Sequence, residues 1–191
     1  MATDRVTPTL IEFPHAGAIP PPKVNLSVDA KEGASISVLD AIGRHRGGTT
    51  MAVNGDVTVS AVRPDSEGRV QLQASADGSV AVELVDEKGK GRSYLELERN
   101  SEADLQILSP TGERRLKLGT LPDGSAAFMA CDRAGLGQVI MGVRPDGNAG
   151  LNLFDSRNKG RASVSITPEG TPSVGLFDGE GKPIANLPGA K

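Results

Sequence analysis

The sequence lacks most of the residues from which a deep globular core is built. Tryptophan is absent, aromatic residues make up only 3 % of the 191 residues, and the chain contains 24 glycines and 13 prolines. Aromatic side chains normally bury the largest areas in a protein core. The core must therefore be a thin layer of aliphatic side chains, which suits a repeat array or an interface shared between chains better than a single globule.

Residues suited to catalysis or metal binding are equally scarce. Cys131 is the only cysteine and His15 and His45 are the only histidines, which excludes an internal disulfide framework and a cysteine zinc site. Two isolated histidines supply neither a Ser-His-Asp triad nor a two-histidine metal site. A calcium loop requires several acidic ligands in a short span, and each repeat unit offers one at its recurring position. We therefore expect no enzyme activity, no metal and no cofactor.

Charge and hydrophobic runs exclude two further classes of partner. The net charge of −3 gives no basic footprint for nucleic acid, and no stretch approaches the ~18 apolar residues of a membrane span. The first thirteen residues contain no basic region followed by an apolar run. We expect cytoplasmic synthesis with no signal peptide. A protein released by cell lysis, such as part of a virion or another assembled particle, would show the same features.

What the chain does contain is a fixed period of 23 residues. With Asp155 as the reference, this spacing gives Asp40, Arg63, Asp86, Ser109, Asp132 and Asp178. Fourteen residues after each reference position, except the last, comes a turn signal: Asn54-Gly55, Asp77-Gly78, Asn100-Ser101, Asp123-Gly124, Asp146-Gly147 and Glu169-Gly170. Seven units follow without insertion or deletion, which indicates a repeat architecture.

Each unit contains two segments in which apolar and polar residues alternate, as in Leu151-Asn152-Leu153 and Val164-Ser165-Ile166. A period of two predicts strands with one buried face. We predict about fifteen strands in an all-β antiparallel meander, with hairpin turns at Asp77-Gly78, Asp123-Gly124 and Asp146-Gly147. A parallel β-solenoid and a barrel or propeller-like closure remain as alternatives.

The alternation predicts which side chains form the apolar layer. We expect the following residues to be buried on one common face: Ile36, Leu72, Val82, Leu95, Leu105, Leu118, Leu151, Val164 and Leu176. Such a face must be covered, and without helices the cover must be more sheet. We favour a homo-oligomeric structural or attachment protein, a trimeric β-prism by analogy with phage fibres and adhesin shafts. The alternative is a monomeric closed β-repeat module that binds carbohydrate or protein.

The chain divides into a leader, residues 1–22, and the repeat array, residues 23–191. The leader contains Pro8, Pro14 and the run Pro20-Pro21-Pro22, which favour extended backbone. It is either a disordered segment or a docking arm that attaches the array to another structural protein. In the second case its apolar residues Leu10, Ile11 and Phe13 would make the contact.

A column of cations lies six residues after the reference position: Arg46, Arg69, Arg92, Arg115 and Arg161. We expect each to pair with the reference Asp across its hairpin loop; a ladder that binds a repetitive polyanion is the alternative. The residue before the reference position is apolar and includes Phe154 and Phe177. We expect the arginine stem to lie over it, and we regard both columns as candidate interaction residues.

The strings LFDSRNKGRASV, LFDGEGKPIANL and VDEKGKGRSYLEL resemble a repeat of many bacterial and phage proteins of unassigned role, LxLxDxxGKxRAxL followed by PDGxP. The resemblance covers residues 23–187, and the units at 40–54 and 63–77 depart from the motif. It implies a β-hairpin repeat protein and brings no activity with it.

Overall fold

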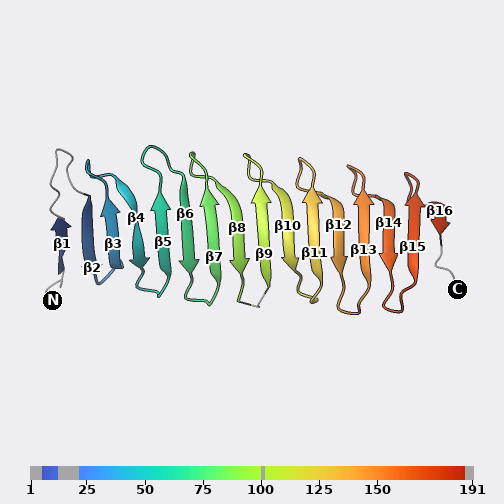
Figure 1. Ribbon diagram of the computed structural model, residues 1–191, viewed down its shortest axis with the longest axis horizontal. Helices are drawn as coiled ribbons and strands as arrows, with labels where there is room; N and C mark the ends of the chain where they lie inside the picture. Colours follow the sequence, from blue (N-terminus) through green and yellow to red (C-terminus); the bar gives the residue numbers. More distant parts are fainter. Residues whose placement is uncertain (1–5, 13–21, 100–101, 188–191) are drawn as a thin grey trace. The chain divides into compact units, whose positions relative to one another are not determined.

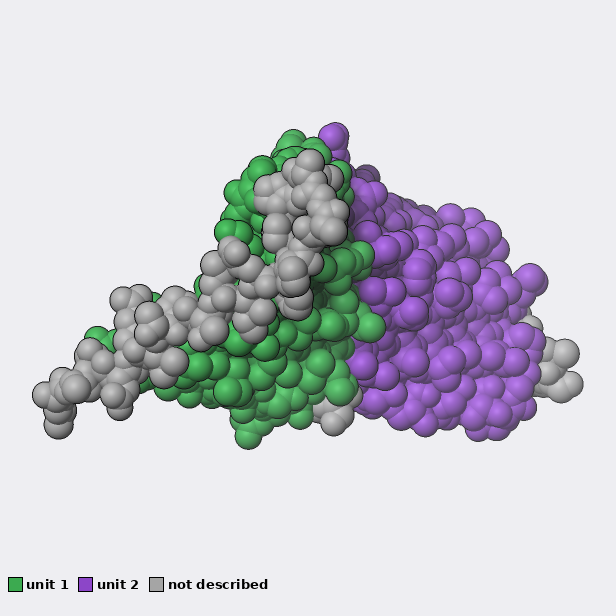
Figure 2. Space-filling view, turned by 60° about the vertical axis from the view of Figure 1, so that its left-hand side comes forward, with its two compact units in different colours: residues 1–99 green, residues 100–191 purple. Residues whose placement is uncertain are grey.

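The fold is described from a computed structural model that defines residues 6–12, 22–99 and 102–187. These residues form strands joined by turns and loops, and none of them is helical. The chain divides into two compact units, residues 1–99 and residues 100–191 (Figure 2).

Unit 1 contains eight strands (Figure 1). They are β1 (Val6–Glu12), β2 (Lys23–Asp29), β3 (Gly33–Leu39), β4 (His45–Met51), β5 (Val57–Val62), β6 (Arg69–Ala74), β7 (Val80–Val85) and β8 (Gly91–Leu97). Each strand pairs antiparallel with the next one along the chain.

Unit 2 repeats this arrangement with eight further strands (Figure 1). They are β9 (Ala103–Leu108), β10 (Arg114–Thr120), β11 (Ala126–Cys131), β12 (Gly137–Val143), β13 (Ala149–Phe154), β14 (Gly160–Ile166), β15 (Pro172–Phe177) and β16 (Pro183–Leu187). Consecutive strands again pair antiparallel.

The predicted antiparallel meander is therefore confirmed, and the fifteen predicted strands correspond to β2–β16. The parallel β-solenoid is wrong, because every described strand pair is antiparallel. Closure into a barrel or propeller is wrong for both units, because the first and last strands of a unit do not pair with each other. Short connections bring each strand back beside its predecessor, which leaves an open sheet.

One strand lies within the predicted leader. The backbone of β1 pairs with β2, with Leu10 opposite Asn25 and Ile11 opposite Val24. The register shifts between Val6 and Thr9, around Pro8, which has no amide hydrogen to donate to a partner. Phe13, the third predicted docking residue, lies outside the described residues.

The turns at Asp77-Gly78, Asp123-Gly124 and Asp146-Gly147 are confirmed. In the second of these, Gly124 N donates to Leu121 O at 2.8 Å and Leu121 N donates to Ser125 O at 2.8 Å. Gly124 has a φ of 83°, a region that glycine enters without steric cost. The hairpin loop is thus three residues long, a β-turn followed by a glycine at positive φ that forms a bulge, rather than a loop of two residues.

The predicted apolar residues do share one face, because the strand register places them opposite one another. The prediction that they are buried is wrong for the single chain. Leu95 and Leu118 are each 53 % exposed. Among the described residues only two hydrophobic side chains, Val85 and Cys131, are buried. A single layer of sheet has no second layer to cover its apolar face, and no described segment folds over it.

Candidate functional site

The apolar face of each unit consists of three rows of side chains that run across the strands. The middle row of unit 1 contains Leu26, Ile36, Thr49, Val59, Leu72, Val82 and Leu95. That of unit 2 contains Leu105, Leu118, Phe128, Met141, Leu151, Val164, Val174 and Leu187. An outer row lies on each side of the middle row, two residues away along every strand.

Side-chain size differs between the rows. The two middle rows contain no glycine, alanine or serine, and Thr49 is their smallest polar member. The outer rows are repeatedly interrupted by small residues, namely Ala34, Gly47, Ala61, Ala74 and Ser93 in unit 1 and Ala103, Ala126, Ala130, Ala149, Ala162 and Ala185 in unit 2. The apolar face is therefore bulky along its centre line and thinner toward both ends of the strands.

The exposed apolar area is large for an isolated chain. Eight strands at ~4.8 Å spacing, each contributing five residues at ~3.4 Å, cover a plane of ~650 Å² in one unit. The largest apolar patch on a typical soluble monomer is ~300–600 Å². None of the three rows contains a charged side chain among the described residues. Each apolar face is thus as large as the largest apolar patch of a typical soluble monomer or larger, which is suggestive of an interface.

Part of the second face of unit 2 is lined by small and polar residues. In unit 2, Ala127, Gly142, Gly150 and Ser165 are successive partners in one register row. They line a shallow groove of about 560 Å³. In unit 2 the two faces therefore differ: one consists of three uncharged rows, and the other combines this groove with apolar side chains such as Ile140 and Phe154.

The reference aspartates organise the loops that we call Asp loops. In the loop between β13 and β14, Asp155 Oδ1 accepts hydrogen bonds from the amides of Arg157 at 2.9 Å and Lys159 at 3.0 Å. The Lys159 amide, with further contributions from Arg161 and the Arg157 amide, lowers the pKa of Asp155 to about 2 against the opposing effect of burial. The same two bonds recur at Asp40, Asp86, Asp132 and Asp178 and, through a hydroxyl, at Ser109.

These two hydrogen bonds explain why Asp or Ser recurs at the reference position every 23 residues. Only a short oxygen-bearing side chain can accept bonds from amides two and four residues later in its own loop. Asp and Ser satisfy this requirement, and Arg63 does not. The loop after Arg63 is different: Arg63 N donates to Gly68 O at 2.9 Å, one residue farther along than in the other loops.

The cation column coincides with a β-bulge. Phe154 pairs with Gly160 and Leu153 pairs with Ala162, so that Arg161 is the extra residue between them. The same register shift occurs at Arg46, Arg92, Arg115, Gln138 and Ile184. It is absent at Arg69, which pairs directly with Val62 after the longer loop. A bulge residue is released from the regular alternation and its side chain is re-aimed.

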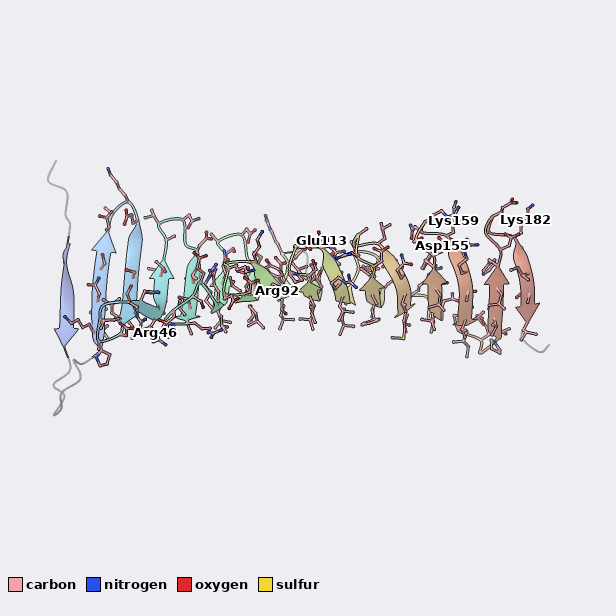
Figure 3. All side chains as sticks on the ribbon, turned by 90° about the horizontal axis from the view of Figure 1, so that it is seen from above. Arg46, Arg92, Glu113, Asp155, Lys159 and Lys182 are labelled. Atoms are coloured by element: carbon pink, nitrogen blue, oxygen red, sulfur yellow. The ribbon has the colours of Figure 1, made fainter. Side chains whose placement is uncertain are left out.

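The bulge brings the predicted Asp–Arg pairs together. Arg92 Nη1 lies 3.3 Å from Asp86 Oδ2, and Arg46 Nη1 lies 3.9 Å from Asp40 Oδ2. Arg161 contacts Asp155 through Nε at 2.9 Å and also through Nη2. Figure 3 labels Arg46, Arg92 and Asp155. Where the column holds Gln138, its amide still donates to Asp132 Oδ2 at 3.2 Å.

The remaining arginines of the column make other contacts. Arg69 Nε donates to Gln71 Oε1 at 3.2 Å. Arg115, whose loop begins with Ser109 rather than Asp, is exposed. Two column members also reach the following repeat, since Arg46 Nε donates to Val62 O at 3.3 Å and Arg161 Nη1 donates to Asp178 O. Arg46, Arg92 and Arg161 therefore link their own loops to the reference Asp, and Arg46 and Arg161 also bond to the next strand or loop. Binding of a polyanion by this column stays a prediction.

The apolar column before the reference position is better covered than the apolar face. Val85 is 7 % exposed and Cys131 is 6 % exposed, while Phe154 and Phe177 are half-buried. Phe177 lies above Gly175, where an added Cβ would be 2.9 Å from its ring. Phe177 thus packs against its own sheet in the single chain, and a contact of either phenylalanine with a partner stays a prediction.

Neither a protein-family model nor a curated protein matches the chain. The resemblance to the bacterial hairpin repeat therefore stays a prediction. No group of three or more His, Cys, Asp or Glu residues that could hold a metal ion occurs in residues 6–12, 22–99 and 102–187. Over the same residues, no helix is long and apolar enough to cross a membrane.

Proposed function

We propose that the protein is a non-enzymatic structural or attachment protein that self-assembles through its apolar faces into a trimeric β-prism. The observation that carries this proposal is the apolar face itself: three uncharged rows in each unit, with middle-row leucines up to 53 % exposed. Leaving this face in water would sacrifice the main favourable contribution to folding.

The occupant that fits this face best is a second copy of it. Identical copies present the same grid of side chains, with ~4.8 Å between strands and ~3.4 Å between residues. The estimated ~650 Å² of one unit approaches the ~800 Å² that each partner contributes to a standard stable interface. With two units in every chain, self-association buries enough area for a stable oligomer.

The size difference between the rows favours three copies. In a triangular prism whose sides are six-residue strands of ~20 Å, the axis lies ~6 Å from each sheet, close to half of the ~10 Å spacing of packed sheets. Large middle-row side chains would fill the axis, and small outer-row residues would lie where two sheets converge at a corner. Two stacked sheets would be equally far apart along the whole strand, so they would require no size difference between the middle and outer rows. Four sheets around an axis would leave a hollow along it.

In this proposal the leader attaches the prism to another structural protein through Leu10, Ile11 and Phe13, as part of an assembled particle such as a virion. The pairing of β1 with β2 supports an arm that remains tied to the array. Deleting residues 1–13 would remove this attachment while leaving the repeat array free to associate.

Light scattering coupled to size-exclusion chromatography at micromolar concentration tests the self-assembly. We expect a species of three times the chain mass of 19.7 kDa. A species of twice that mass would support association through the face but replace the prism by a two-layer sandwich. A monodisperse monomer would contradict the proposal and favour a monomeric binding module.

A further inference from the structure

The strand ends of each unit form two rims with different charge. We call the Asp-loop side the loop rim, formed by residues 40–46, 63–69 and 86–92 in unit 1 and by 109–115, 132–138, 155–161 and 178–184 in unit 2. The opposite side is the turn rim, formed by residues 29–33, 52–56 and 75–79 in unit 1 and by 121–125, 144–148 and 167–171 in unit 2. In a meander, alternate connections lie at opposite ends of the strands.

The loop rim is basic and the turn rim is acidic in both units. Each unit's loop rim contains seven Lys or Arg residues against five Asp or Glu residues. The turn rim contains one basic residue against four acidic residues in unit 1, and one against three in unit 2. The same polarity therefore appears twice, in two sets of loops with different sequences.

Internal contacts sharpen this polarity. On the loop rim, reference aspartates are occupied by their own loop amides and by the cation column, as for Asp155. Lys88, Arg157 and Lys159 are exposed and form no ion pair with any described residue. Lys159 is labelled on its loop in Figure 3. These cations are available to a partner.

The carboxylates of the turn rim are equally available. Asp77, Asp123 and Asp146 accept hydrogen bonds from the amides of Ser79, Ser125 and Asn148 at 2.8–2.9 Å. All three are exposed, and none forms an ion pair with a described residue. The turn rim thus presents negative charges without an ion-pair partner among the described residues in one turn of unit 1 and in two turns of unit 2.

We infer that, in the assembly, the loop rim of one copy lies against the turn rim of the next. This inference rests on the proposed self-assembly and adds its orientation. When three sheets turn their apolar faces toward an axis that runs across the strands, every corner joins one rim of a copy to the opposite rim of its neighbour. The contact is heterologous and closes after three copies. Opposite charges meet at each corner, whereas an axis parallel to the strands would gather like charges at each end.

Zero-length cross-linking with a carbodiimide, followed by mass spectrometry, tests the orientation in the wild-type oligomer. Within one unit of a chain the two rims are separated by strands of six or seven residues, ~20 Å or more, so the diagnostic links are those between residues of the same unit. An amide bond between a loop-rim lysine and a turn-rim carboxylate of the same unit can therefore form only between copies. We expect links from Lys88 to Asp77, both in unit 1, and from Lys159 to Asp123 or Asp146, all in unit 2. An oligomer whose links all join residues of the same rim would overturn the inference.

Charge reversal gives an independent test. Asp77→Lys, Asp123→Lys and Asp146→Lys together make the turn-rim variant, and Lys88→Glu, Arg157→Glu and Lys159→Glu together make the loop-rim variant. We expect each variant alone to dissociate at protein concentrations at least tenfold above those at which the wild type does. Far-ultraviolet circular dichroism checks that each retains its strands.

Mixing the two variants separates this inference from the proposed function. A mixed trimer has two corners between unlike copies, which carry opposite charges with native sign at one corner and reversed sign at the other. Its third corner joins two like copies and still repels. We therefore expect association to recover in part in the mixture, and we expect this recovery to weaken with added salt. If the wild type is trimeric and both variants remain trimeric at all concentrations, the orientation is wrong while the self-assembly stands. If the wild type is monomeric, both fail.

Discussion

Leu118 offers the sharpest test of whether the apolar face is covered. It lies in the middle row of unit 2, opposite Leu105 and Phe128, and is 53 % exposed in the single chain. The change Leu118→Ala removes most of an apolar side chain without adding charge or altering the backbone. We expect it to weaken the assembled protein strongly, because the proposed prism would bury this side chain near its axis.

The size of the change in unfolding free energy distinguishes a covered apolar face from an exposed one. A Leu→Ala change in a packed core costs ~2–5 kcal/mol, whereas substitutions at exposed surface positions usually stay within ~0.5 kcal/mol. The same reasoning applies to Leu95, the matching middle-row residue that is equally exposed in unit 1. Because every copy carries the change, a trimer would lose three side chains from one interface.

Chemical denaturation and light scattering of Leu118→Ala, compared with the wild type, measure these effects. Ile42→Ala is the matched control, since Ile42 lies in an Asp loop, is 73 % exposed and is outside the apolar face. We expect the control to match the wild type and Leu118→Ala to unfold at lower denaturant and to dissociate more readily. Unchanged stability and mass for both Leu118→Ala and Leu95→Ala would refute the covered face.

Three further predictions concern the loops and the second face. The pKa of Asp155 in the folded protein, about 2, lies below its ordinary value of 3.8. The ionised carboxylate therefore stabilises the fold above about pH 4, and this stabilisation is lost as the pH falls toward 2. Asp155→Asn should reduce this part of the acid unfolding transition measured by circular dichroism. Burial raises the pKa of the Cys131 thiol, so a thiol reagent at pH 7 should react slowly with native protein and faster with protein unfolded in denaturant; equal rates would contradict the burial of this side chain. Asn158 has a φ of 58° where most equivalent loop positions hold glycine. Because a β-branched residue is strained at positive φ, we expect Asn158→Val to lower the melting temperature and Asn158→Gly to keep or raise it. Equal melting temperatures for the two variants would contradict this account of the loop.

The hydrogen bonds within the Asp loops could not be predicted from the sequence. The column of Asp40, Asp86, Asp132, Asp155 and Asp178 was visible from the 23-residue period, and so was the cation six residues later. The period could not show that the Asp oxygen caps two amides of its own loop, or that a bulge turns Arg161 toward it. Those features depend on the register between two strands, and a slip of one residue would remove them.

The sequence by itself determined the strands, their turns and the composition of both faces, because alternation with a period of two and glycine at positive φ are local properties of the chain. Tertiary structure alone decided that consecutive strands pair antiparallel in open sheets rather than stacking as parallel coils or closing. It also decided that the predicted core is exposed in one chain. Burial depends on what lies opposite a face, and the pattern of a single strand contains no information about that second layer.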